Sequence, residues 1–277
     1  ILGVVAFVMT VVMVLNDFDL SVGTMASLSG IVIGVLLQAE QPLVVVIIAA
    51  LVVGMLGGLL NGLLVAYIGI TPFVATLATL TIFGGLAFSV SGGRTIFGAV
   101  FPDALTEFAN GGIPLGTINE QLVRLPHLTI IALVVLVLVW FVLEQTVFGR
   151  RLYTIGGSME AARLAGVRVR WLRLLAFVIT GVGAALAGAM LTGQLATANP
   201  TLGDGLMLNA IAAVFLGMTM SQEGEPHVLG TLVGVLLIGV LANGFTQLGV
   251  DTYIQRILTG TIIIASVTLS SISRRNR

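Results

Sequence analysis

Residues 43–68 read LVVVIIAALVVGMLGGLLNGLLVAYI, and this uncharged stretch decides the fold. A helix needs about twenty mostly apolar residues to cross the hydrocarbon core of a bilayer. Runs of this kind recur along nearly the whole chain, for example at 128–143 and 228–246. The pattern predicts an integral membrane protein built as a bundle of transmembrane helices, and it excludes a soluble globular domain.

The composition of the 277-residue chain agrees with this prediction. Hydrophobic residues make up 57% of the chain, charged residues only 9%, and the mean hydropathy is +1.14. A soluble domain would carry about a quarter charged residues. The formal net charge of zero gives no indication of a nucleic-acid partner. Because the chain has no Cys and its two His stand far apart, we expect no metal site and no cofactor.

Hydropathy, interrupted by Gly, Pro and polar residues, divides the chain into nine predicted spans of one all-α polytopic transmembrane domain, 1–277. The predicted spans are 1–15, 21–38, 43–68, 72–90, 127–146, 172–193, 206–219, 228–246 and 253–272. Ile1 is not Met and already lies inside an apolar run. We therefore expect that an N-terminal segment is missing and that the full-length protein has ten spans.

Arginine placement predicts the orientation of the bundle. Cytoplasmic loops of membrane proteins carry an excess of positive charge. The connection 147–171 holds five Arg and the C-terminal tail 274–277 holds three, with an even number of predicted spans between them. We expect both to be cytoplasmic, which leaves the polar connections 91–126 and 194–205 outside as candidate docking surfaces.

A faint internal repeat accompanies this topology. An offset of 182 residues carries Leu20, Gly23 and Met25 onto Leu202, Gly205 and Met207, and it carries Gly57, Asn61 and Gly62 onto Gly239, Asn243 and Gly244. An odd number of spans between equivalents makes the halves, about 1–90 and 172–272, antiparallel in the membrane. Inverted repeats of this kind are common in transporters.

The loop 147–171 contains the signals of a short isolated helix. Gly156 and Gly157 interrupt the preceding structure, Ser158 is a good N-cap, and Gly166 suits the helix end. The residues leave two interpretations open: a loop anchored by Arg at the headgroups, or a knob that docks into a cytoplasmic partner. The candidate docking residues are Ser158, Met159, Glu160, Ala161, Ala162, Arg163, Leu164 and Gly166.

This stretch resembles the coupling-helix loop of bacterial ABC importer permeases of the ribose/monosaccharide (branched-chain-type) family, which read roughly G-R-x-x-Y-A-I-G-G-N-x-x-A-A-R-L-S-G-I. Further matching patches follow the family's order along almost the whole chain: Asp19–Gly23, Asn61–Gly62, Thr71–Leu77, Gly112–Pro114, Leu229–Gly234 and Asn243–Gly244. One departure stands at 216–227, where the family usually has Gly-Gly-Thr-Ser and a Gly-rich segment; it would alter contacts at the ATPase side.

The resemblance implies a permease subunit that moves a monosaccharide or sugar-like solute across the bacterial inner membrane. It implies three partners besides lipid: a cytoplasmic ABC ATPase dimer contacting 158–166, a periplasmic or lipoprotein sugar-binding protein, and a second permease subunit, by default an identical one. The chain itself would not be an enzyme. It has no G-x-x-x-x-G-K-[ST] motif, and no Lys with which to form one.

Several polar residues interrupt the spans. Asn61 and Asn243, near the middle of their spans, either face a pathway or hydrogen-bond between helices. Phe73 and Thr76 complete the set of candidate pathway-lining residues. Asp17 and Asp19 are either functional charges at bilayer depth or residues at a span end that cap the next helix, and we favour capping.

Two other functions remain possible on the sequence. An ion-coupled secondary transporter of a small polar solute would also have inverted repeats, but it usually has ionisable groups at mid-membrane. A membrane-embedded enzyme would need a catalytic constellation, and the sequence has no recognisable one. The predicted isolated cytoplasmic helix favours the ABC permease.

Overall fold

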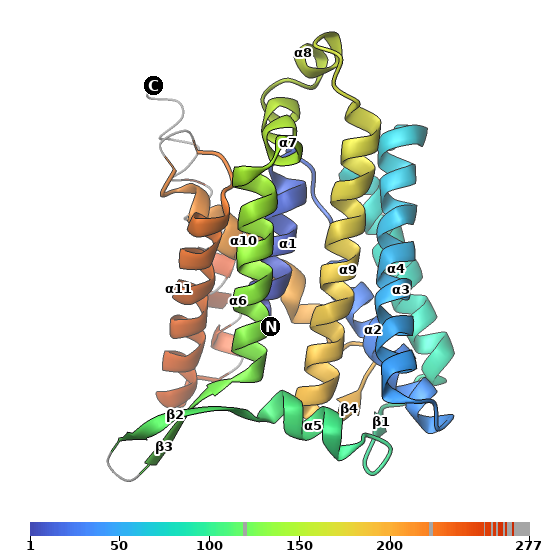
Figure 1. The fold of residues 1–277 in the computed structure, drawn as a ribbon, viewed down its shortest axis with the longest axis vertical. Coiled ribbons are helices and arrows are strands. Elements are labelled where there is room, and N and C mark those ends of the chain that lie inside the picture. The colour runs from blue at the N-terminus through green and yellow to red at the C-terminus, as the bar shows by residue number, and fades with distance from the viewer. Residues whose placement is uncertain are drawn as a thin grey trace.

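The structure, a computed structural model, is a bundle of long helices (Figure 1). It describes residues 1–118, 121–221 and 224–251, and beyond these residues 253–255, 257, 258, 260–262, 264 and 268. Half of the predicted span 253–272 lies outside the described residues, as does the whole tail 274–277. In the described part the fold class is confirmed as an all-α polytopic membrane protein.

The predicted spans up to residue 247 all appear as apolar helices with nearly the predicted bounds. The helices are α1 Leu2–Met13, α2 Val22–Gln38, α3 Leu43–Leu63, α4 Pro72–Ser91, α6 His127–Trp140, α9 Val169–Leu195, α10 Asp204–Met218 and α11 Val228–Gln247. Short π-helical turns, η1 Leu64–Ile68 and η2 Phe141–Gln145, extend α3 and α6. By length and apolarity, α3 with η1, α4, α6 with η2, α9 and α11 are each able to cross a membrane, whereas α1, α2 and α10 are shorter.

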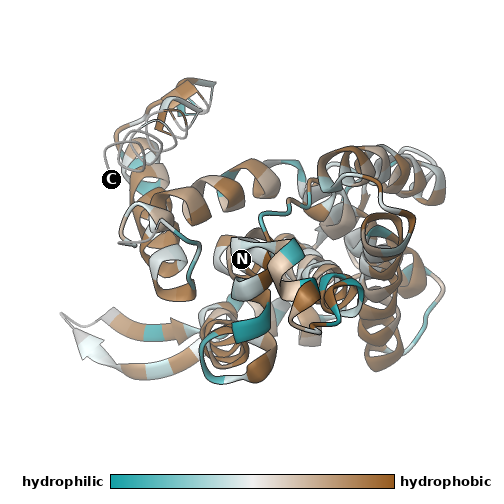
Figure 2. Cartoon of the chain, turned by 90° about the horizontal axis from the view of Figure 1, so that it is seen from above, coloured by the Kyte–Doolittle hydropathy of each residue, from teal (hydrophilic) through white to brown (hydrophobic). Residues whose placement is uncertain are grey.

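Burial separates inner from outer helices. Every residue of α1 after Leu2 is buried, and α9 packs against α1, α2 and α3 at the centre of the bundle. The outer helices α3, α4, α6 and α11 instead expose large apolar side chains such as Val44, Phe73, Val137 and Val240. In the view from above, most of the helical ribbon has the colour of hydrophobic residues (Figure 2). An apolar outer surface of this extent is what contact with lipid requires.

The two ends of the bundle differ as the Arg distribution predicts. One end carries α7 Val147–Gly157 and α8 Met159–Leu164. The other carries α5 Asp103–Asn110, the hairpin of β2 Gly112–Ile118 and β3 Gln121–Pro126, and the short antiparallel pair of β1 Ile96–Phe97 and β4 Thr197–Ala198 (Figure 1). The connections 91–126 and 194–205 therefore meet at the end opposite 147–171.

Two connections contain more structure than the sequence indicated. We treated 147–157 as part of a loop, but it forms α7, which Thr146 caps by accepting a hydrogen bond from the Gly149 amide at 3.3 Å. Glycines at 149, 156 and 157 conceal this helix in the sequence. Two of them allow close packing, because a Cβ on Gly149 would overlap the backbone of Leu143 and one on Gly156 would overlap that of Val14. The connection 91–126 likewise holds α5 and a hairpin.

Helix α3 packs on α9 through glycines. A Cβ on Gly54 would overlap Ala185, and one on Gly62 would lie 2.9 Å from the Leu174 Cα. Small residues let helix backbones approach closely in a membrane, where packing replaces the hydrophobic effect as the source of association. The close approach of α3 and α9 therefore depends on glycine, which has no Cβ, at these positions.

We predict that Gly58→Ala lowers the stability of the bundle. The new Cβ would lie 2.8 Å from the Val178 Cα, so the helices must separate, at a cost of about 1–3 kcal/mol. The measurement is the thermal unfolding midpoint in detergent. Gly239→Ala on α11, whose Cβ would meet nothing within 4 Å, is the matched control. Equal midpoints for both variants would contradict this packing.

Candidate functional site

Two breaks in the helical structure, each a non-helical connection between two helices, meet inside the bundle. The segment 14–21 separates α1 from α2, and 196–203 separates α9 from α10. The N-termini of α2 and α10 touch, because a Cβ on Gly23 would lie 2.8 Å from the Gly203 carbonyl oxygen. The offset of 182 residues carries the last residue of α1, Met13, to the last residue of α9, Leu195, and the first residue of α2 to the first of α10. The assignment of halves at 1–90 and 172–272 stays a prediction.

The first break is held by a buried chain of hydrogen bonds. Asp19 accepts bonds from the Ser21 amide at 2.9 Å and the Ser21 hydroxyl at 2.6 Å, at the residue just before α2 and not at an amide of the helix itself. The Asn61 amide on α3 donates to Ser21 Oγ at 2.9 Å. Thr79 on α4 donates to Asn61 Oδ1 at 2.7 Å. One network thus joins the break to α3 and α4.

The second break is held by local turns and one contact to α2. Asn199 Oδ1 accepts a bond from the Thr201 amide at 2.8 Å, and the Gly203 amide donates to Ser27 Oγ at 2.8 Å. Ala198 lies against Gly34, near the C-terminal end of α2, and Gly203 lies against Gly23, near its N-terminal end. The second break therefore runs alongside α2. Irregular backbone at membrane depth is tolerated where it is buried in protein or lines a cavity.

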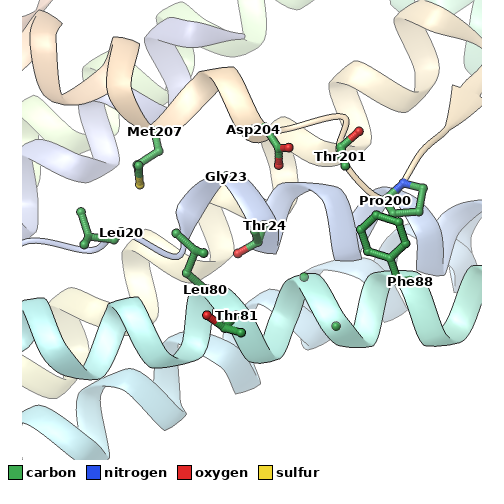
Figure 3. A pocket seen from close by; sticks show the side chains of 12 residues that line it. Leu20, Gly23, Thr24, Leu80, Thr81, Phe88, Pro200, Thr201, Asp204 and Met207 are labelled. Carbon is green, nitrogen blue, oxygen red and sulfur yellow. The ribbon is translucent and has the colours of Figure 1, made fainter. Parts of the chain in front are cut away.

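A groove of about 540 Å³ opens beside the meeting point of the breaks (Figure 3). Helix α2 contributes Thr24, and α4 contributes Thr81 and Phe88. Thr201 and Asp204 face them from the second break and the start of α10. Hydroxyls, one carboxylate and an aromatic ring form a surface able to hydrogen-bond and stack on a polar solute.

None of the four candidate pathway-lining residues is among the residues that line this groove. Asn61 is 1% exposed within its network, and Thr76 is buried with its hydroxyl 2.7 Å from the Pro72 carbonyl oxygen. Phe73 is 56% exposed at the start of α4. Asn243 lies on an exposed face of α11. Their role in a pathway stays a prediction. Thr24, Thr81 and Asp204 were not predicted as groove residues, although Asp204 lies in the candidate docking connection 194–205.

The predicted short helix is α8, and its caps are as expected. Ser158 accepts a hydrogen bond from the Ala161 amide at 3.2 Å, and Gly166 ends the turn with φ +79°. Ala162 is fully buried and anchors the helix. Glu160, Arg163 and the 84% exposed Leu164 face outward. In the described part of the chain neither charge has an ion-pair partner within 4 Å.

Helix α7 connects α8 to the first break. The Asn16 side chain donates to the Gly156 carbonyl oxygen at 2.6 Å, and a Cβ on Gly156 would overlap the Val14 carbonyl. At the other face of the break, Arg173 on α9 binds Asp17 with two hydrogen bonds of 2.8 Å. The break is thus clamped between α7 and α9, and α8 projects from the same end.

Tyr153 ties α7 to the connection between α10 and α11. Its hydroxyl lies 3.1 Å from the Pro226 carbonyl oxygen and 3.2 Å from Glu144 Oε1. Burial, with Glu144 beside it, raises the pKa of Tyr153, so the hydroxyl stays protonated and able to donate. The segment around 226 therefore lies at the α8 end, as the predicted topology requires.

We predict that Asp17→Asn is strongly destabilising and that adding Arg173→Gln restores much of the loss. Their side chains are 6% and 14% exposed, so removing one partner leaves a nearly buried charge, at a cost of about 3–5 kcal/mol. The thermal midpoint of both single variants and the double variant measures the coupling. Additive losses would contradict a direct Asp17–Arg173 interaction.

Comparisons with known proteins identify the family. A family model described as branched-chain amino acid transport system / permease component matches residues 1–267. The ribose import permease protein RbsC of Bacillus subtilis is 38% identical over 271 residues, which cover 96% of this chain and 80% of that protein. The autoinducer 2 import system permease protein LsrD of Yersinia enterocolitica is 35% identical over 276 residues, which cover 98% and 81%. No solved structure matches.

The matches extend over nearly the whole chain, including the α8 motif and both breaks. The chain therefore belongs to this family of membrane transport permeases, and its resemblance to the ABC importer permeases of the ribose/monosaccharide family is confirmed.

Proposed function

We propose that this chain is the membrane-spanning subunit of an ABC importer that carries a monosaccharide or a sugar-like solute across the bacterial inner membrane. The observation that carries the proposal is α8, a capped helix held out at one end with Glu160, Arg163 and Leu164 exposed. The similarity to ribose and autoinducer 2 import permeases supports the substrate class.

In this proposal the α8 end is cytoplasmic and docks into the ATPase, which hydrolyses ATP while the permease does not. The exposed apolar Leu164 beside two unpaired charges suits such a contact, since interfaces combine an apolar anchor with a polar rim. Residues Ser158–Gly166 are the proposed contact, and the C-terminus lies on the same side. The connections 91–126 and 194–205, at the far end, are the proposed docking surface for a sugar-binding protein.

The groove beside Asp204 is the part of the solute pathway that we propose this chain contributes. It is open to the outside of the chain, so a second permease subunit, by default an identical copy, would close it. Movement of α8 would reach the groove through α7 and the first break, because Gly156 touches Val14 and the Asp19 network reaches Thr79 on α4. Alternating access needs a bundle with two stable arrangements, biased from both ends.

An ion-coupled carrier is the competing function. Such a carrier needs a carboxylate free to bind an ion near mid-membrane. Asp17 is occupied by Arg173, and Asp19 accepts bonds from Ser21 and Asn61. Asp204 does line the groove. Asp204 is therefore the carboxylate that such a carrier would use, whereas the exposed helix α8 favours the ABC importer. A direct test of energy coupling separates the two.

We predict that Glu160→Arg weakens association with the ATPase encoded beside this gene by at least tenfold. The substitution reverses a charge on the exposed face of α8 and leaves the buried Ala162 in place. Co-purification in detergent measures the association. Glu107→Arg makes the same charge change on α5 at the opposite end and serves as the control. Equal ATPase recovery with both variants would count against the contact.

We also predict that Gly85→Trp abolishes solute uptake while ATPase co-purification is retained. Gly85 lines the groove, and a Cβ there meets nothing within 4 Å, so an indole fills the groove and leaves the helix packing intact. The assay is uptake of labelled ribose and of autoinducer 2 by cells. Gly239→Trp on the exposed face of α11 is the matched control. Normal uptake by Gly85→Trp would exclude the groove from the pathway.

A further inference from the structure

A second groove, of about 540 Å³, lies at the α8 end between the start of α7 and the start of α9. We call it the basic groove. Arg151 on α7 and Arg168 just before α9 line it, together with Trp171, and its apolar lining includes Phe148, Leu172 and Leu175. Val147 and Gly166 complete the lining, and Gly166 is also the last residue of the proposed ATPase contact. No residue of the basic groove lines the groove of Figure 3.

The two arginines of the basic groove have no ion-pair partner within 4 Å among the described residues. Both are exposed, and no acidic residue is among the residues that line the groove. Within the described residues the ion pair closer than 4 Å joins Arg173 to Asp17, and neither Arg151 nor Arg168 takes part in it. Two guanidinium groups in one groove attract an anion, and the planar donors of Arg suit the oxygens of phosphate.

The position of the basic groove relative to the bilayer narrows the class of anion. Arg168 precedes α9, a helix long and apolar enough to span the membrane, and Leu172 and Leu175 lie in its first two turns. Trp171 is 51% exposed, and Trp is enriched at the level of lipid headgroups. The groove thus passes from charged to apolar within a few residues of a span end, as the headgroup and acyl chain of a phospholipid do.

We propose that the basic groove binds an anionic phospholipid such as phosphatidylglycerol, with the phosphate between Arg151 and Arg168 and an acyl chain along the exposed Trp171 and the half-buried Leu175. A soluble phosphate would use the arginines but gain nothing from the apolar lining. A zwitterionic lipid would leave part of the positive charge uncompensated. The bound lipid would hold α7 against α9, on either side of the first break.

The test is native mass spectrometry of the full chain in detergent, titrated with phosphatidylglycerol and, separately, with phosphatidylcholine. We expect selective retention of phosphatidylglycerol, and a loss in Arg151→Gln/Arg168→Gln of about fivefold in apparent affinity per arginine. Arg150→Gln/Arg170→Gln removes the same charge from two exposed arginines at the same end that do not line the groove, and it should retain the lipid.

Trp171→Ala gives an independent variant, because it keeps every charge and removes one exposed wall of the groove. Weaker phosphatidylglycerol binding in this variant supports the site. Equal losses in the two double variants would overturn it and leave a general charge effect. Equal retention of the two lipids would also overturn it. So would displacement of phosphatidylglycerol by millimolar inorganic phosphate, or the finding that the ATPase, and not lipid, covers the two arginines.

Discussion

Hydrogen bonding of the backbone at membrane depth is the constraint on which the structure depends. Lipid supplies no partners for free amide and carbonyl groups, so each chain break within the bundle needs partners from the protein. Asp19 and Ser21 supply them at the first break, and Asn199 and Ser27 at the second. Because the glycines at 23 and 203 let the two helix starts touch, the breaks share one location. The groove lies beside this meeting point, and Gly23, Thr201 and Asp204 are among the residues that line it.

The first break connects helix α8, at one end of the bundle, to the groove through a series of direct contacts. Helix α8 follows α7 directly, with Ser158 as the single residue between them. Helix α7 touches the first break at Val14 and Asn16. From there the Asp19 network leads to α3 and α4, and α4 forms one wall of the groove. The contacts are hydrogen bonds and backbone packing rather than flexible loops. They provide the kind of coupled element that an ATP-driven change of access needs.

The sequence predicted what depends on periodicity and on local chemistry. Uninterrupted apolar runs predicted the helices, because a helix follows from one segment at a time, whereas the packing of α3 on α9 is known only from the structure. Ser158 and Gly166 fixed α8 for the same reason. The groove could not be predicted, because it joins Thr24, Thr81 and Asp204 from three helices distant in sequence. Helix α7 was missed because its glycines, which permit close packing on Leu143 and Val14, look like helix breakers in the sequence.

The central claim is that ATP hydrolysis by a partner drives this chain to import a sugar-like solute. The most direct test is uptake of labelled ribose and autoinducer 2 into proteoliposomes that contain this chain, its neighbouring-gene ATPase and the corresponding binding protein. The account predicts uptake only with ATP, and none when the ATPase is omitted or a non-hydrolysable analogue is supplied. Uptake driven by a proton or sodium gradient in the absence of ATP and ATPase would contradict it and identify the chain as a secondary carrier.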